Sequence, residues 1–118
     1  MDEKTSRQLI DAGIDVQEIL SRFMGNEALM MKFLLRFPQD ESFQQLKGAM
    51  AANNVDEAYR AAHALKGLTG NLAMKSLFEQ VCRVVEDLRG GNLNSAEGKM
   101  KGLEASYCCV VDALRSMS

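Results

Sequence analysis

Apolar residues recur every three or four positions along most of the chain, which is the spacing of one face of an amphipathic α-helix. The chain has a single proline and little clustering of β-branched residues, which argues against a sheet. The pattern therefore predicts an all-α fold, with helices over about 26–37, 38–53, 55–71, 74–89 and 93–116. An N-terminal segment, about 1–24, is predicted to form one or two short helices broken near Gly13.

The first long helix is predicted over 26–37 and is interrupted at Pro38. Asn26 is predicted to be the N-cap of the helix over 26–37. Its apolar stripe is expected to comprise Leu29, Phe33, Leu34 and Phe37. Pro38 lacks an amide donor and suits the first turn of a new helix. Because the connections are only a few residues long, consecutive helices should pack antiparallel. We expect a single domain over 1–118, an up-down antiparallel four-helix bundle with short additional N-terminal helices.

Composition narrows the function classes without naming one. The 118 residues carry a formal net charge of -2, which gives no electrostatic footprint for nucleic acid. No apolar run is long enough to span a bilayer, and the N-terminus lacks the apolar core of a signal peptide. We therefore expect a cytoplasmic protein with no nucleic-acid partner and no membrane insertion.

The three cysteines, Cys82, Cys108 and Cys109, show no CxxC spacing and have no histidine partner for a metal site. Free cysteine usually behaves as a small hydrophobe. All three are therefore expected to be buried, without a redox role.

The only histidine, His63, is predicted to lie on the solvent face of its helix. On a helical wheel of about 100° per residue, His63 lies roughly 140° from the centre of the apolar stripe. That stripe is Val55, Ala58, Ala62, Leu65, Thr69 and Leu72. Lys66 lies at the edge between the histidine and the core, and Tyr59 and Arg60 flank the same surface from the preceding turn.

Two glycines, Gly67 and Gly70, interrupt the same helix after the histidine. An interior glycine costs about 0.5–1 kcal/mol relative to alanine. Gly70 fits a helix C-terminus in a left-handed conformation, whereas Gly67 lies in mid-helix on the exposed face. Missing side chains on an outer face favour close approach by another protein. We therefore expect Tyr59, Arg60, Gly67 and Gly70, together with Ala64 beside the histidine, to form a docking surface.

An exposed imidazole in these surroundings favours phosphoryl chemistry. A metal site lacks further ligands, a hydrolytic triad lacks its nucleophile, and the chain has no Gly-rich phosphate loop. Neutral imidazole is a competent nitrogen nucleophile near pH 7, and the Lys66 ammonium can pair with a phosphoryl group on that nitrogen. Accepting and donating a phosphoryl group fits these residues best.

The stretch "HALKGLTGNLA" resembles the signature of histidine-containing phosphotransfer (Hpt) domains. "GIDVQEILSRFMGNEALMMKFLLRF" and "LRGGNL" resemble segments of small stand-alone members. The resemblance implies that His63 is the phosphoacceptor at Nε2, that Lys66 stabilises the phosphoryl group and that Gly67 admits a receiver domain. It also implies a monomeric carrier in a two-component phosphorelay, without autonomous kinase activity. Its partners would be response-regulator receiver domains and an upstream hybrid histidine kinase.

The resemblance further implies that the receiver supplies the aspartate and Mg²⁺, while this chain binds no cofactor. Two residues depart from the family pattern. Ala73 stands where the family has a second glycine, a change confined to the turn between helices. Val85 stands where relatives often carry Glu or Gln hydrogen-bonded to Nδ1, and it is expected to face the histidine-bearing helix near its outer edge.

Other interpretations remain open at this stage. An adaptor bundle of the same fold would bind a receiver or another signalling partner without phosphotransfer, and Val85 supports that alternative. An autonomous kinase is disfavoured because 118 residues leave no room for an ATP-binding domain beside the bundle. The chain begins at Met1, as a complete protein would, but a domain cut from a hybrid kinase would look similar. The sequence names neither the kinase and regulator served nor the direction of phosphoryl flow.

Overall fold

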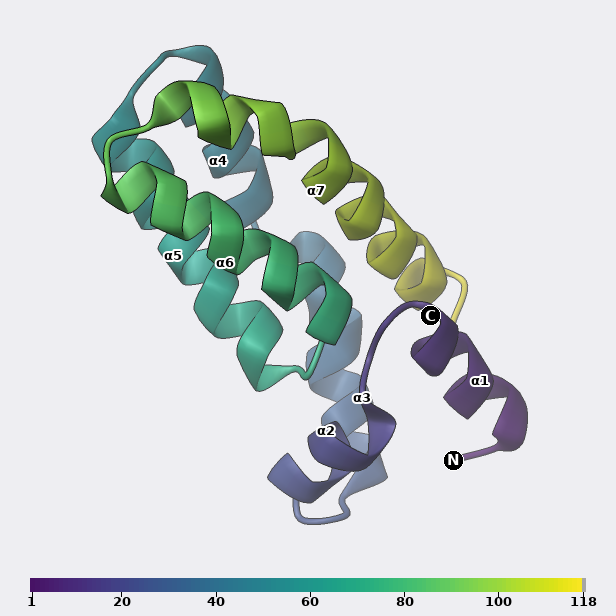
Figure 1. Cartoon of the computed structure of the whole chain (residues 1–118). Helices are drawn as coiled ribbons and strands as arrows, with labels where there is room; N and C mark the ends of the chain where they lie inside the picture. Colours follow the sequence, from purple (N-terminus) through teal and green to yellow (C-terminus); the bar gives the residue numbers. More distant parts are fainter. Residues whose placement is uncertain (118) are drawn as a thin grey trace.

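The computed structural model describes residues 1–117 and is helical almost throughout (Figure 1). Its elements are α1 (Glu3–Asp11), α2 (Val16–Arg22), α3 (Glu27–Arg36), the 3₁₀ turn η1 (Phe37–Gln39), α4 (Ser42–Ala51), α5 (Val55–Asn71), α6 (Lys75–Arg89) and α7 (Leu93–Arg115). Residues 1–117 form no β-strand, and the one isolated bridge pairs Ile14 with Met74. The predicted all-α fold is confirmed.

Helices α4 to α7 form the bundle. Each packs along the next, α4 against α5, α5 against α6 and α6 against α7, with short turns between them (Figure 1). Side chains join α4 to α7: the rings of Phe43 and Tyr107 stack with their centroids 4.1 Å apart, and Lys47 Nζ lies 2.6 Å from Glu104 Oε2. The predicted antiparallel four-helix bundle is therefore also confirmed.

The N-terminal helices lie at one end of the bundle, where α1 adjoins the C-terminal end of α7 and α2 lies near the turn between α5 and α6 (Figure 1). The Asp15 amide donates to the Ala73 carbonyl at 2.8 Å, next to the bridge between Ile14 and Met74. Lys75 Nζ, at the start of α6, lies 2.8 Å from a carboxylate oxygen of Glu18 on α2. These contacts bring α2 close to the end of α5.

The apolar stripe predicted for residues 26–37 is partly wrong. Asn26 caps α3 as expected, with its side-chain oxygen accepting from the Leu29 amide at 3.0 Å. Leu34 and Phe37 are buried, but Leu29 and Phe33 are 40% and 41% exposed. The face that meets the core is instead Met30, Leu34 and Phe37. The other apolar side chains of α3 are only partly covered, and Phe33 packs against Phe23, with ring centroids 5.4 Å apart, and not against the core.

The helix predicted over 38–53 begins later than expected. Pro38 lies in η1, and α4 begins only at Ser42. The Asp40 carboxylate accepts from the Ser42 amide at 2.9 Å, and an aspartate bonded to nearby backbone in this way favours a turn over a continuous helix. Pro38 thus sits in the first turn of a short 3₁₀ element and not of α4.

Five helices end in the same hydrogen-bonded turn, in which the residue after the C-cap takes a positive φ. That residue is Gly13 after α1, Met24 after α2, Asn53 after α4, Ala73 after α5 and Gly91 after α6. At α5, the Ala73 and Met74 amides donate to the Gly70 and Thr69 carbonyls at 3.1 and 3.0 Å, which is the Schellman pattern. Ala73, with φ 52°, therefore holds a conformation that favours glycine, at a cost of roughly 1–2 kcal/mol.

Replacing Met24 with glycine is expected to raise the free energy of unfolding by up to about 1 kcal/mol. Glycine takes φ 54° without a Cβ clash, although its freer unfolded chain offsets part of the gain. The Met24 side chain is 94% exposed, so its removal sacrifices no packing. Urea denaturation of Met24→Gly beside Met24→Ala, which keeps the Cβ, measures the difference. A glycine variant less stable than the alanine variant would refute the strain argument.

The expected burial of the cysteines is wrong. Cys82 is half-buried, and Cys108 and Cys109 are exposed. On α7, Tyr107 and Val110 are core positions, so the two residues between them fall on the opposite face of the helix.

No helix within residues 1–117 is long and apolar enough to cross a membrane.

Candidate functional site

Helix α5 displays His63 on its solvent face. The helix begins at Asn54, whose side-chain oxygen accepts from the Glu57 amide at 3.1 Å, and Asp56 and Glu57 lie in its first turn, where carboxylates are favourable. Its buried residues are Ala58, Ala61, Ala62, Leu65 and Thr69. The Thr69 hydroxyl is satisfied inside the helix by donating to the Leu65 carbonyl at 2.9 Å. His63 lies opposite these residues and is exposed, as the wheel predicts.

The imidazole has a ring neighbour but no hydrogen-bond partner within residues 1–117. The ring of Tyr59, one turn earlier, lies 5.8 Å from it between centroids and is tilted by 44°. Arg89, from α6, lies 6.0 Å from the Tyr59 ring centroid and 2.5 Å from Glu86. The Tyr59 side chain, and then Glu86, raise the pKa of Arg89. Arg89 thus lies against Tyr59, while neither imidazole nitrogen is held by a hydrogen bond within residues 1–117.

Val85 does not lie near the outer edge of α6, as the sequence predicts. It is 0% exposed, so it belongs to the core and not to the outer edge of α6. The α6 wheel explains the difference, because Val81, Val84, Val85 and Leu88 together form its buried face. A valine at this position completes the core and offers nothing to Nδ1.

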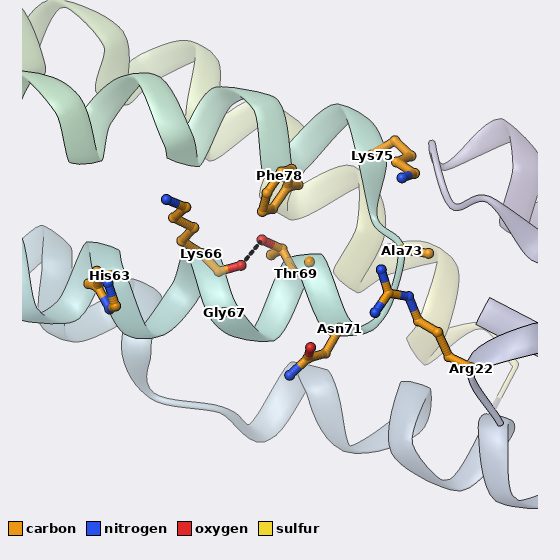
Figure 2. Close-up of a pocket in the computed structure, with 10 residues that line it drawn as sticks. Arg22, His63, Lys66, Gly67, Thr69, Asn71, Ala73, Lys75 and Phe78 are labelled. Atoms are coloured by element: carbon orange, nitrogen blue, oxygen red, sulfur yellow. Dashed lines mark hydrogen bonds between the residues drawn. The ribbon is translucent and has the colours of Figure 1, made fainter. Parts of the chain in front are cut away.

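A groove runs along α5 from His63 towards the turn before α6. It encloses about 330 Å³, and we refer to it as the His63 groove. Its lining is Arg22, His63, Lys66, Gly67, Thr69, Gly70, Asn71, Ala73, Lys75 and Phe78. Figure 2 shows His63 at one end, Arg22 and Lys75 at the other, and Lys66 extending from α5 towards α6. The lining thus contains three cations and no carboxylate.

The three cations differ in their partners. The Lys66 ammonium makes no ion pair and no side-chain hydrogen bond within residues 1–117. Arg22 and Lys75 share the carboxylate of Glu18, at 3.7 and 2.8 Å. The ammonium nearest to the imidazole along α5 is therefore the one available to an incoming anion.

The two glycines of α5 have different surroundings. A Cβ built on Gly67 would meet nothing within 4 Å, so no contact inside the chain explains the missing side chain. A Cβ on Gly70 would lie 3.0 Å from the ring of Phe78 on α6. Gly70 also lies inside α5 without a positive φ, so the expected left-handed conformation is wrong. Packing of α6 against α5 is a sufficient reason for Gly70, and its docking role stays a prediction.

The remaining predicted docking residues border the same surface. Arg60 is exposed and pairs with Glu57 at 3.0 Å, and Ala64 is exposed next to His63. Sequence reasoning missed Arg22, Lys75 and Phe78, which line the groove from α2 and α6. A wheel of α5 alone holds no information about them, because tertiary packing brings them to the groove.

Comparison with known protein families gives a match over most of the chain. A model of the Hpt domain matches residues 35–116, which include α4 to α7 and with them His63. The resemblance drawn from "HALKGLTGNLA" is thereby confirmed. Neither the comparison with curated proteins nor that with solved structures gives a match.

Proposed function

Because this chain belongs to the Hpt domain family, which indicates a histidine phosphotransfer role in a phosphorelay, we propose that it carries the phosphoryl group on His63 between receiver domains. One observation supports the residue assignment above all. The only histidine is exposed on α5 with unpartnered nitrogens, one turn from an unpaired ammonium and from a glycine with open space around it. A nucleophile, a counter-charge and room for a partner thus adjoin one another.

The proposed step needs little from this chain. The lone pair of His63 Nε2 attacks the phosphorus of the receiver's aspartyl phosphate, and the electron pair of the breaking P–O bond stays on the aspartate carboxylate. Nδ1 keeps its proton, so no proton has to leave. Lys66 neutralises part of the phosphoryl charge, and Mg²⁺ comes from the receiver. Phosphoryl transfer depends mainly on positioning and electrostatics, which suits so sparse a site.

Transfer from a phosphorylated receiver tests the proposal. The protein, incubated with receiver domains labelled on aspartate with ³²P, should acquire label that is stable in alkali and lost in acid, as expected of a phosphoramidate. ATP alone should give no label. If no labelled receiver from the same genome transfers to the chain, the proposed function is wrong.

Lys66→Ala is expected to slow transfer by about tenfold, equivalent to about 1.4 kcal/mol of transition-state stabilisation, which is typical of a hydrogen bond to a charged group. Thermal stability should hardly change, because the ammonium has no partner to lose. Lys101→Ala, an exposed lysine on α7, is the matched control and should transfer normally. Equal rates for the two variants would remove Lys66 from the mechanism.

One observation favours a second candidate, an adaptor that binds a receiver without accepting phosphate. Val85 leaves the imidazole without the hydrogen-bond partner that relatives often have. An adaptor would bind receivers equally well after His63→Gln and would never acquire label, so the transfer assay separates the two. We further propose a monomer in the cytoplasm, served by an upstream hybrid histidine kinase.

A further inference from the structure

The His63 groove is longer than a phosphoryl group needs. Asn71 follows His63 by eight positions, so about 12 Å of helix lies between them at about 1.5 Å per residue. Arg22 and Lys75 occupy the Asn71 end, opposite His63 (Figure 2). A phosphoryl group on the imidazole lies within reach of Lys66 but extends only a few ångströms along the groove. The far pair of cations, which also pairs with Glu18, thus lies beyond the reach of the phosphoryl group.

The charge of the groove contrasts with that of the chain. The whole sequence has a formal net charge of -2, yet the groove lining has three cations and no carboxylate. Glu18, which is not part of the lining, compensates Arg22 and Lys75 together. One carboxylate shared by two cations leaves positive charge at the far end of the groove, where like-charged partners are disfavoured and acidic ones are favoured.

We infer that Arg22 and Lys75 form a second docking point, which receives acidic side chains on the surface of the receiver beside its phosphorylated aspartate. This inference rests on the proposed function, because a receiver that brings its aspartate to His63 must cover the adjoining groove. Glu18 competes with the receiver for the same cations. Arg22 lies on α2, outside the matched residues 35–116, so this docking point distinguishes the chain from family members without such an α2.

The test separates docking from chemistry by measuring KM and kcat for transfer from a phosphorylated receiver. Arg22→Glu and Lys75→Glu should each raise KM about tenfold and change kcat less than twofold. The rise should shrink in about 0.5 M salt, because screening weakens exposed charge pairs. Lys101→Glu, on α7 away from the groove, is the matched control and should leave KM unchanged.

Glu18→Gln is expected to change KM in the opposite direction. It keeps a side-chain acceptor for Lys75 while removing the competing charge, so KM should fall about two- to threefold.

Lys75→Glu also breaks the contact between α2 and α6, so circular dichroism and thermal unfolding accompany each variant. Arg22→Gln, which leaves the Lys75–Glu18 pair intact, should still raise KM about threefold.

Three results would overturn the inference. The first is an unchanged KM in folded Arg22→Glu and Arg22→Gln, and the second is an equal rise of KM in Lys101→Glu. The third is a change of kcat without a change of KM in the Arg22 and Lys75 variants. If the wild-type protein accepts phosphate and the substitutions of Arg22 and Lys75 leave KM unchanged, only the docking point is wrong. If wild-type protein accepts no phosphate from any receiver, the proposed function fails and the docking point fails with it.

Discussion

Replacing His63 with glutamine should abolish phosphoryl transfer and leave the fold unchanged. Glutamine is polar and of similar reach, but its amide nitrogen is not a nucleophile, and the chain has no second histidine to take over. The imidazole is exposed and makes no hydrogen bond within residues 1–117, so the free energy of unfolding should shift by less than about 0.5 kcal/mol. Label after incubation with a phosphorylated receiver, together with thermal unfolding, measures both effects.

This pair of readouts isolates the role of His63. Residual label in His63→Gln at the wild-type level would mean that another residue accepts the phosphate. Marked destabilisation would mean that the imidazole supports the fold, contrary to its exposure. Binding of the unphosphorylated receiver should survive the change, since the docking surface around the histidine is untouched.

Gly67→Gln should impair transfer by about tenfold or more while making the helix slightly more stable. Glutamine has a better helix propensity than glycine by about 0.5–1 kcal/mol, and nothing within 4 Å of the new Cβ opposes it. Any loss of transfer must therefore come from contact with the partner, one turn from the phosphoacceptor. Steady-state transfer from a phosphorylated receiver should show the loss mainly in KM.

Gly98→Gln provides the matched control. Gly98 also lies inside a helix, α7, and a Cβ there also meets nothing within 4 Å. It lines a different surface, with Gln80 and Arg83 of α6, so its substitution should raise stability without affecting transfer. Normal transfer by Gly67→Gln would contradict the view that the bare backbone at Gly67 admits the receiver.

The register of α5 could be predicted because the period of a helix fixes which residues share a face. The wheel places His63 opposite Ala58, Ala62 and Leu65, and in the structure these three residues are buried while His63 is exposed. The same method failed for α3, where Leu29 and Phe33 are apolar but exposed. Periodicity indicates which residues of a helix share a face. How much of that face is buried depends on neighbouring elements, about which the pattern of one helix holds no information.

Tertiary packing accounts for the other differences. Gly70 lacks a side chain where Phe78 approaches it from another helix, and Arg22 reaches the groove from α2. The sequence predicts a turn after α5, but the left-handed conformation of Ala73 accompanies hydrogen bonds from the Ala73 and Met74 amides to the Gly70 and Thr69 carbonyls, which only the structure shows. A pattern on one helix cannot reveal what a second helix brings to it.

The central claim, that His63 Nε2 carries the phosphoryl group, is tested most directly by NMR of the ¹⁵N-labelled imidazole before and after incubation with a phosphorylated receiver. His63 is the only histidine, so its two ring nitrogens can be assigned without ambiguity. We predict a new phosphorus–nitrogen coupling at Nε2, with Nδ1 still bearing its proton. Phosphate incorporation that leaves both ring nitrogens unchanged would contradict the account.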